Sequence, residues 1–274
     1  MEDPSSPAAA PRLPKLVCLD FDGTIVGDGV SEVFLRWLEV LSNNGALWVV
    51  NTGRTLFHAL EGIQDHNIRP LPHYIIAKER EIFAPGQFNR WVDFGKWNRR
   101  CQKEHARLFK SCRKFLGEVQ EFVAEKTHAE FVATPDDPAG IIAATNEEMD
   151  RICAFIEEHH NLPKELSYER NSIYLRFSHI GYNKGTALTE LARMLEISSA
   201  DVFVAGDSHN DVSMLDREHA GMIACPVNAI DEIKALVAAN DGYIAGRPAS
   251  EGVAEAFAYF FAGEGEERRP EDRA

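Results

Sequence analysis

Short apolar runs alternate with stretches of helical periodicity along the first part of the chain. The runs have the length and composition of strands buried on both faces of a parallel sheet, and they predict strands at 15–21, 46–50 and 73–77. Between these strands, apolar residues recur at helical spacing over 33–41 and again from about residue 55. This β-α-β-α-β order predicts right-handed crossovers and a doubly wound, Rossmann-like parallel sheet of the α/β class.

A different pattern fills residues 86–179. The stretch 98–126 has no proline and a single glycine, so it predicts one long helix. The other elements expected there are strands at 131–134 and 140–144, a helix at 146–160, and a hairpin over 167–177 that turns near Arg170-Asn171. We interpret this part of the chain as a smaller α+β domain inserted into the larger sheet.

The alternation of strands and helices seen in the first part of the chain resumes after residue 180. The elements expected are helices at 184–195, 229–238 and 250–261, strands at 202–205 and 221–225, and a helix through Met214 and Leu215. Residues 14–85 and 180–262 are therefore expected to form the core, and residues 86–179 the inserted domain. Residues 1–13 and 263–274 lack an apolar pattern, and we expect a disordered leader and a disordered acidic tail.

The charge of the chain narrows the classes of partner that it could bind. Of its 274 residues, 43 are acidic and 29 are basic, which gives a formal charge of -14. We therefore expect neither a nucleic-acid partner nor a membrane partner. The five cysteines are widely spaced, which favours free thiols, and no segment resembles a signal peptide or a membrane span. A cytoplasmic protein, monomeric or weakly dimeric, is the expectation.

Two carboxylates one residue apart end the first predicted strand. Side chains alternate along a strand, so Asp20 and Asp22 are expected to point the same way and to lie close together. Two neighbouring negative charges are stable only with a cation or a shared proton between them. The pair predicts a metal site or an acid/base site. An EF-hand calcium loop does not fit, because Gly23 stands at the fourth loop position instead of the sixth and Ser31 occupies the twelfth, where glutamate is needed.

Three further polar groups lie at or beside the ends of predicted strands, where open α/β sheets bind their ligands. These groups are Thr52-Gly53-Arg54, Lys184, and the pair Asp207 and Asp211. Carboxylates are the oxygen ligands that Mg²⁺ prefers. A hydroxyl, a glycine amide and a lysine supply hydrogen-bond donors and positive charge for phosphate. Together the groups predict a site for a divalent cation and a phosphorylated ligand.

These residues resemble the four motifs of the haloacid dehalogenase superfamily of aspartate-nucleophile phosphatases. The motifs occur in order as Asp20-Phe21-Asp22-Gly23-Thr24, Thr52, Lys184 and Gly206-Asp207-Ser208-His209-Asn210-Asp211. The resemblance covers about residues 15–261. Because the insert lies between the second and third motifs, the chain resembles the subgroup with a large α/β cap domain of the C2B type. Glu81-Ile82-Phe83, the paired Trp91 and Trp97, and Asn183-Lys184-Gly185 are similar to sucrose-phosphate phosphatases.

The resemblance implies a role for each motif residue. Asp20 would be the nucleophile that forms an aspartyl phosphate, and Asp22 would be the general acid and base. Asp20, Asp207 and the backbone carbonyl of Asp22 would hold Mg²⁺, with Asp211 beside them. The phosphate would be bound by Thr52, Gly53 and Lys184. The implied activity is Mg²⁺-dependent hydrolysis of a small phosphorylated sugar or related metabolite.

Specificity is expected to come from the inserted domain. The candidate substrate contacts are Arg54, Asn210, Arg170 and Tyr174. The resemblance to sucrose-phosphate phosphatases implies a small Val-Gly pair before Glu81, and this chain has Lys78-Glu79-Arg80 there instead. The histidines expected to be solvated or packed, and not to be ligands, are His58, His105, His159 and His160. Two other functions stay open: a phosphohexomutase of the same fold, and a non-catalytic protein that binds phosphosugars.

Overall fold

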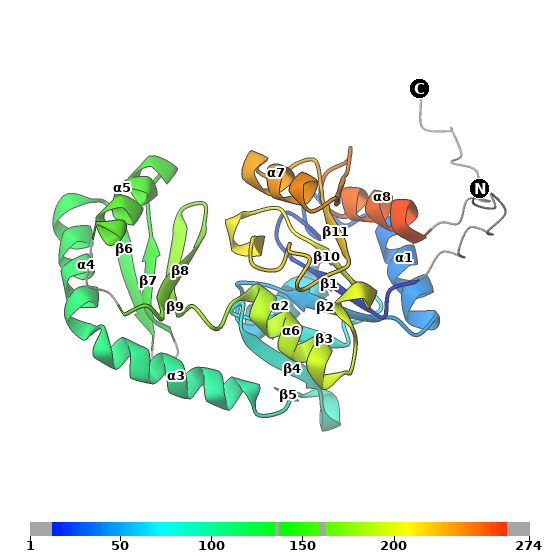
Figure 1. Ribbon diagram of the computed structural model, residues 1–274, viewed down its shortest axis with the longest axis horizontal. Helices are drawn as coiled ribbons and strands as arrows, with labels where there is room; N and C mark the ends of the chain where they lie inside the picture. Colours follow the sequence, from blue (N-terminus) through cyan, green and yellow to red (C-terminus); the bar gives the residue numbers. More distant parts are fainter. Residues whose placement is uncertain (1–12, 135–136, 159–162, 262–274) are drawn as a thin grey trace, which may run out of the picture.

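A computed structural model of the chain describes residues 13–134, 137–158 and 163–261. Within them the chain forms a large body on an eight-stranded sheet and a smaller body on a four-stranded sheet (Figure 1). The large sheet has the order β12-β11-β10-β1-β2-β3-β4-β5. Its strands are β1 (Leu16–Leu19), β2 (Leu47–Asn51), β3 (Tyr74–Ala77), β4 (Glu81–Pro85), β5 (Trp91–Asp93), β10 (Val202–Ala205), β11 (Met222–Cys225) and β12 (Tyr243–Ile244).

The pairings from β12 to β3 are parallel, and only β4 and β5 join the sheet antiparallel. The predicted doubly wound parallel sheet is thus confirmed. Residues 91–93 pair with β4, so the large sheet continues beyond residue 85, where the sequence predicted the core segment to end. An antiparallel edge strand of three residues carries too little periodicity to be recognised from its own sequence.

Helices cover both faces of the large sheet. On one face lie α1 (Glu32–Asn43), α2 (Leu56–Asp65) and α8 (Ala249–Phe261), and on the other lie α6 (Lys184–Met194) and α7 (Asp231–Ala239). In the central strand β1, Val17 and Leu19 belong to the first apolar core, whereas Leu16 and Cys18 belong to the second. Because successive side chains of a strand point to opposite faces, a wholly apolar strand needs a layer on each side.

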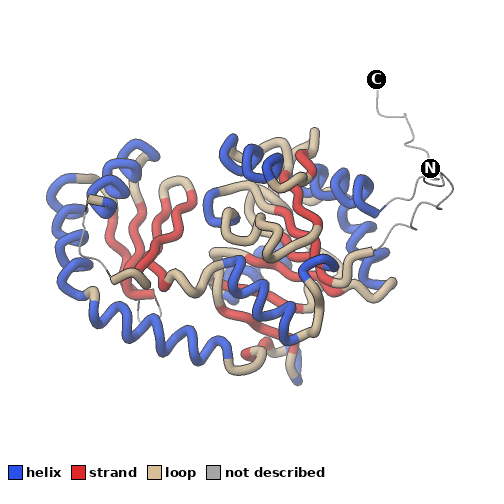
Figure 2. Tube along the Cα trace, viewed as in Figure 1, coloured by secondary structure: helices blue, strands red, loops and turns tan. Residues whose placement is uncertain are grey.

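The smaller body is an antiparallel sheet with helices on one face, and we call it the cap (residues 97–179). Its strands, in the order β6-β7-β9-β8, are β6 (Glu130–Thr134), β7 (Asp137–Ile142), β8 (Leu166–Asn171) and β9 (Tyr174–His179). Helix α3 (Trp97–Ser111) runs from the large body to the cap, and α4 (Arg113–Lys126) and α5 (Asn146–Glu157) pack on the sheet. Both lie on the side away from the large body, so the other face of the cap sheet points toward it (Figure 2).

The single helix predicted over 98–126 is wrong, because Cys112 separates α3 from α4. The two halves pack against different partners. Trp97 and Cys101, at the start of α3, belong to a core of the large body, whereas Phe115 and Val119 of α4 belong to the core of the cap. A single straight helix could not bury its first half in the large body and its second half in the cap. The turn between α3 and α4 changes the direction of the chain.

Two other local predictions also need correction. The hairpin turns two residues later than expected, at Ser172, which has φ 53°, and β8 pairs through Asn171. The helix predicted through Met214 and Leu215 is replaced by the 3-10 turn η3 (His209–Asp211) followed by further turns. Met214 and Leu215 are both fully buried there, so their adjacent apolar side chains fill the core without a helical periodicity.

The predicted tail, residues 1–12 of the predicted leader, and the final two residues of the helix predicted over 146–160 lie outside the described residues. Among the helices that the structure describes, each is too short or too polar to cross a membrane.

Candidate active site

The ends of three neighbouring strands bring most of the predicted site residues together. Asp20 follows β1, Thr52 follows β2 and Asp207 follows β10, and these strands are adjacent in the large sheet. Lys184 reaches the same edge as the first residue of α6, where Asn183 and Thr186 form a capping box. Because parallel strands end at one edge of a sheet, residues distant in the sequence meet there.

A buried lysine joins two of the predicted carboxylates. Lys184 Nζ donates to Asp20 Oδ1 at 2.5 Å and to Asp211 Oδ1 at 2.6 Å, and both Lys184 and Asp211 are fully buried. Burial alone would lower the pKa of Lys184, but the negative charges of Asp20 and Asp211 outweigh it and raise the pKa above its usual value. Lys184 therefore stays positively charged at neutral pH. It can orient Asp20 and face an anion at the same time.

The second oxygen of Asp211 holds the loop after β10. Asp211 Oδ2 accepts from the backbone N–H of Asp207 at 2.8 Å and from that of Ser208 at 3.0 Å. Both carboxylate oxygens of Asp211 are thus engaged. Gly206 is required beside it, because a side chain at that position would collide with the Asp211 carboxylate. Asp211 is therefore placed to position Lys184 and the loop, and Asp20 and Asp207 are better placed as direct metal ligands.

The carboxylates of Asp20, Asp207 and Asp211 fit a divalent cation. Each offers an oxygen within 4.8 Å of the others, and Thr24 Oγ1 donates to Asp207 Oδ1 at 2.8 Å. Burial, followed by the charge of Asp211, raises the pKa of Asp20 well above its usual value and that of Asp207 to about 6. A cation between these oxygens would relieve the repulsion. The donor set is all oxygen, as Mg²⁺ requires.

Asp22 lies apart from that cluster. Its two carboxylate oxygens accept from Arg54 Nε at 2.8 Å and Arg54 Nη2 at 2.6 Å, and its side chain is 47% exposed. The Arg54 guanidinium also lies over the ring of Phe21, at 4.8 Å from its centroid. Arg54, predicted to bind phosphate or substrate, is thus engaged by Asp22 in this structure. The two carboxylates of the first motif occupy different environments, one buried against Lys184 and one exposed beside a guanidinium.

The tip of the β3–β4 hairpin adds a residue that sequence reasoning did not assign to the site. Glu79 is buried, and its backbone N–H donates to the Thr52 carbonyl at 2.9 Å. Glu79 Oε1 accepts from Asn210 Nδ2 at 3.0 Å. A side chain added at Gly53 would approach that same Glu79 oxygen. The departure at Lys78-Glu79-Arg80 was the signal, because it placed a carboxylate where a small residue was expected.

The two faces of the cap sheet carry different side chains, and one of these faces points toward the large body. Tyr168 and Arg170 of β8 bond to α5, through Glu157 and Asp150 respectively. Arg170 is therefore not a substrate contact, and that prediction is wrong. By strand alternation the intervening Glu169 points the other way, and Tyr174, which is 55% exposed, shares that open face of the sheet.

Two hydrogen bonds join the open face of the cap to the loops that follow β2 and β10. Arg176 Nη1 donates to the Gly53 carbonyl at 3.2 Å, and Ser208 Oγ donates to Asn171 Oδ1 at 3.3 Å. Glu169 lies directly opposite Arg176 in the β8–β9 pair. Glu169, Asn171 and Arg176 were all missed by the sequence analysis. Only the tertiary contact of cap with core distinguishes them from ordinary hairpin residues.

The histidine and cysteine predictions agree with the structure where it describes these residues. His105 is buried, accepts at Nε2 from the His179 backbone N–H at 3.1 Å, and places Nδ1 at 2.9 Å from the Cys101 carbonyl oxygen. It is a packed histidine between α3 and β9. The five cysteines are free and buried. His159 and His160 lie outside the described residues.

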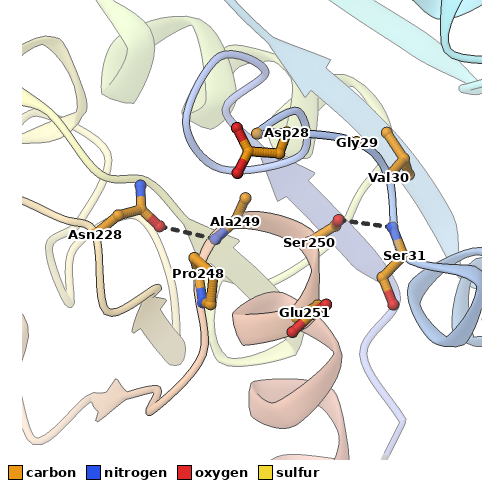
Figure 3. Close-up of a pocket in the computed structure, with 10 residues that line it drawn as sticks. Asp28, Gly29, Val30, Ser31, Asn228, Pro248, Ala249, Ser250 and Glu251 are labelled. Carbon is orange, nitrogen blue, oxygen red and sulfur yellow. Dashed lines mark hydrogen bonds between the residues drawn. The ribbon is translucent and has the colours of Figure 1, made fainter.

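A pocket of about 480 Å³ lies beside the first-motif loop (Figure 3). Gly27, Asp28 and Ser31 line one part of it, and residues around the start of α8 line another. Asn228, also in its wall, donates through Nδ2 to the Gly23 carbonyl at 2.8 Å and accepts from the Ala249 N–H. None of the predicted catalytic residues lines this pocket, so it is separate from the predicted site.

Comparison with known proteins agrees with the family resemblance. A family model described as haloacid dehalogenase-like hydrolase matches residues 104–257, more than half of the chain. The chain is 25% identical over 251 residues to a Bacillus subtilis 5-amino-6-(5-phospho-D-ribitylamino)uracil phosphatase, covering 90% of this chain and 95% of the relative. It is 31% identical over 112 residues to a phosphoglycolate phosphatase of Methanoculleus marisnigri, covering 40% of this chain and 47%, about half, of that relative.

Solved structures show the same fold at low sequence identity. The sucrose-phosphatase of Synechocystis sp. PCC6803, solved with sucrose and phosphate, superposes with a TM-score of 0.69 at 19% identity. The match covers 91% of this chain and 98% of that one. A large core sheet with a sheet-and-helix cap is therefore a shared architecture, and at this identity the likeness concerns the fold.

Proposed function

The chain belongs to the haloacid dehalogenase-like hydrolases, and from that premise we propose that it is a phosphomonoesterase working through an aspartyl-phosphate intermediate. The observation that carries the proposal is the buried contact of Lys184 with Asp20 and Asp211, beside Asp207. This arrangement combines a positioned carboxylate nucleophile, a fixed positive charge and an oxygen set for a divalent cation. The substrate class that we propose is a small phosphorylated sugar or related metabolite.

Asp20 is the proposed nucleophile. One of its oxygens is held by Lys184, so the carboxylate has a fixed orientation at the end of β1. Its attack on phosphorus forms an aspartyl phosphate and releases the substrate alcohol, which divides one difficult displacement into two easier ones. Lys184 stays close to the reacting carboxylate, where its charge offsets the negative charge of the phosphoryl oxygens.

Asp22 is the proposed general acid and base. Its exposed carboxylate lies on the strand end two residues from Asp20 and is oriented by Arg54. It would give a proton to the leaving alcohol oxygen in the first step and take one from the attacking water in the second. Thr52 and the Gly53 amide lie at the end of β2 and are the proposed donors to the remaining phosphoryl oxygens.

Asp20 and Asp207 would hold Mg²⁺, with the backbone carbonyl of Asp22 as a third ligand and Asp211 fixing the loop. When bound, the cation would supply positive charge that neutralises the transferring phosphoryl group. Thr24 keeps the Asp207 carboxylate in place through its hydroxyl hydrogen bond. A side chain at Gly23, which has φ 84°, would collide with Asp207, so the close approach of the two loops requires glycine there.

The cap would exclude water from the aspartyl phosphate while the alcohol leaves. Arg176 and Asn171 already contact the Gly53 and Ser208 loops, so the open cap face lies over the catalytic edge. Tyr174 and the neighbouring side chains of this face would meet the alcohol part of the substrate. Water must enter afterwards for hydrolysis, which distinguishes a phosphatase from a mutase.

The test is a panel of phosphorylated metabolites assayed for inorganic phosphate, with and without Mg²⁺. The panel contains sucrose 6-phosphate, glucose phosphates and phosphoglycolate. We expect phosphate release from at least one sugar phosphate, abolished by chelation of the cation and restored when Mg²⁺ is added back. Failure of the whole panel to release phosphate would refute the proposal. Isomerised sugar phosphate without free phosphate would instead identify a mutase.

A further inference from the structure

Two carboxylates meet where the cap closes on the catalytic edge. Glu79 projects from the β3–β4 hairpin beside Gly53, and Glu169 projects from the open face of the cap sheet. The charge of Lys184 lowers the pKa of Glu169, and the charge of Glu79 raises the pKa of Lys184. Glu79 and Glu169 also repel one another. Burial, then the negative charge of Glu79, raises the pKa of Glu169 to about 8. With a pKa above neutrality, Glu169 keeps a proton at pH 7, and a positive charge placed beside both side chains would allow it to ionise.

The neighbouring cations do not balance this pair. Arg176, opposite Glu169, is also directed to the Gly53 carbonyl. Lys78 extends toward Glu81, with Nζ at 3.9 Å from Oε2. Lys184 is bonded to Asp20 and Asp211. Arg176 can therefore offset one carboxylate, and ionisation of both Glu79 and Glu169 needs a further positive charge.

An unpartnered acceptor lies in the same place. Asn210 is 4% exposed, and its Nδ2 donates to Glu79 Oε1 at 3.0 Å. Because a carboxylate accepts that bond, the orientation of the amide follows, and Oδ1 is the free end. Asn210 Oδ1 has no hydrogen-bond partner among the described residues. A buried amide oxygen without a donor is costly unless a ligand supplies one.

The backbone that carries Glu79 is held in an unfavourable conformation. Lys78 and Glu79 have φ 50° and φ 64°, and the Arg80 N–H closes the turn on the Ala77 carbonyl at 3.1 Å. Glycine and asparagine suit such consecutive left-handed positions, and other residues there cost stability. A long acidic side chain at position 79 is retained in spite of that cost. Strain of this kind is common where a side chain serves a binding site.

We propose that Glu79, Glu169 and Asn210 form a subsite that selects phosphomonoesters whose alcohol part carries an ammonium group. The inference rests on the phosphatase function proposed above. An ammonium group has three N–H donors, which match the two carboxyl groups and the amide oxygen, and its charge allows Glu79 and Glu169 to be ionised together. A hydroxyl at the same position would donate to one acceptor but would supply no positive charge that favours the ionised form of Glu169. The alcohol part would leave with its ammonium group intact, so the group is recognised and not transformed.

The test compares ligands that differ in one group. Glucosamine 6-phosphate is compared with glucose 6-phosphate, and O-phosphoethanolamine with 2-hydroxyethyl phosphate. Titration calorimetry on full-length Asp20→Asn protein with Mg²⁺ measures binding without turnover. In at least one pair, we expect the ammonium compound to bind roughly 10- to 100-fold more tightly, the range of a charged hydrogen bond.

Variants then locate the preference. Glu79→Gln and Glu169→Gln, each combined with Asp20→Asn, keep the shape and one acceptor oxygen but remove the ionisable group. Each should reduce the ammonium preference about tenfold and leave the affinity for the hydroxyl compound within about twofold. The control Glu121→Gln changes an exposed carboxylate of α4 and should keep the full preference. Equal binding of both members in both pairs, or a preference that survives in both subsite variants, overturns the proposal.

The phosphatase function is read out separately, as phosphate release by the wild-type chain from the same compounds. Ammonium-selective binding without turnover of any compound would support the subsite and refute the phosphatase function. Turnover with no ammonium preference in binding would support the phosphatase function and refute the subsite.

Discussion

The catalytic edge of the large sheet and the open face of the cap differ in how their polar side chains are satisfied. At the catalytic edge, Lys184, Asp20 and Asp211 bond to one another, and Asp211 also holds the loop backbone. On the cap face, Tyr174 is exposed and Glu169 has a pKa raised to about 8 by burial and by repulsion from Glu79. The groups that we propose to perform the chemistry are preorganised by the protein, whereas those that we propose to recognise the substrate keep hydrogen-bonding capacity for it.

The largest effect should come from the preorganised side. Asp20→Asn removes the proposed nucleophile, so the rate of phosphate release should fall by at least about 10⁴-fold. Phosphate assays and thermal unfolding on the same preparations measure this. Asp28→Asn, which changes an exposed carboxylate after the same strand, should keep the wild-type rate. A variant at position 20 that retains turnover would show that another group attacks phosphorus.

A smaller loss should follow from Asp22→Asn, because the general acid contributes about 10²- to 10⁴-fold. The loss should depend on the substrate. A phenol such as p-nitrophenol leaves without protonation, so p-nitrophenyl phosphate should be affected much less than a sugar phosphate. The ratio of the two rates in wild type and variant measures this difference. An equal loss on both substrates would contradict the role of Asp22 as an acid.

The two faces of the cap sheet can be separated with two tyrosines. Tyr168 packs on Phe177 and donates to Glu157 at 2.6 Å, so Tyr168→Ala should lower the free energy of unfolding by about 2–3 kcal/mol. Tyr174 lies on the open face, and Tyr174→Ala should change stability by less than about 0.5 kcal/mol. The KM of the Tyr174→Ala variant for its phosphorylated substrate should instead rise severalfold. Urea unfolding and steady-state kinetics of both variants test this. A large stability loss in Tyr174→Ala together with a raised KM in Tyr168→Ala would show that the two faces are assigned the wrong way round.

The junction between the two regions should be sensitive to acid. Burial, then the charge of Arg80, lowers the pKa of His105 to about 4 from the ordinary 6.5. Between these values the unfolded chain binds the proton and the folded chain does not, so stability contributed by neutral His105 is lost as pH falls. At pH 5 the loss should be about 2 kcal/mol relative to pH 7.5.

The measurement is urea unfolding of wild type and His105→Gln at both pH values. Because glutamine does not titrate, the advantage of wild type over the variant should shrink by that amount at the lower pH. A difference that stays constant between the two pH values would show that His105 is not kept neutral by the fold.

The catalytic side was largely predictable from the sequence. The apolar runs before Asp20, Thr52 and Asp207 are short and buried on both faces, which identifies parallel strands, and polar residues at their ends must meet at one edge. The binding side was less predictable. Arg170 and Glu169 are adjacent in the chain, and the side of the cap sheet that each faces depends on where α5 packs. The break at Cys112 has the same origin, because the two halves of the predicted helix bury against different bodies.

By itself, the sequence determined the two-sided burial of the large sheet, the insertion of a second domain and the residues at the catalytic edge. These features follow from local periodicity and from the rule that parallel strands end together. Only the tertiary structure decided that Asp22 pairs with Arg54, that Asp211 holds Lys184, and that Glu79 contacts Asn210, 131 positions away in the chain. Such contacts depend on how the cap and the hairpin close over the sheet, and local pattern carries no information about side chains brought together by that packing.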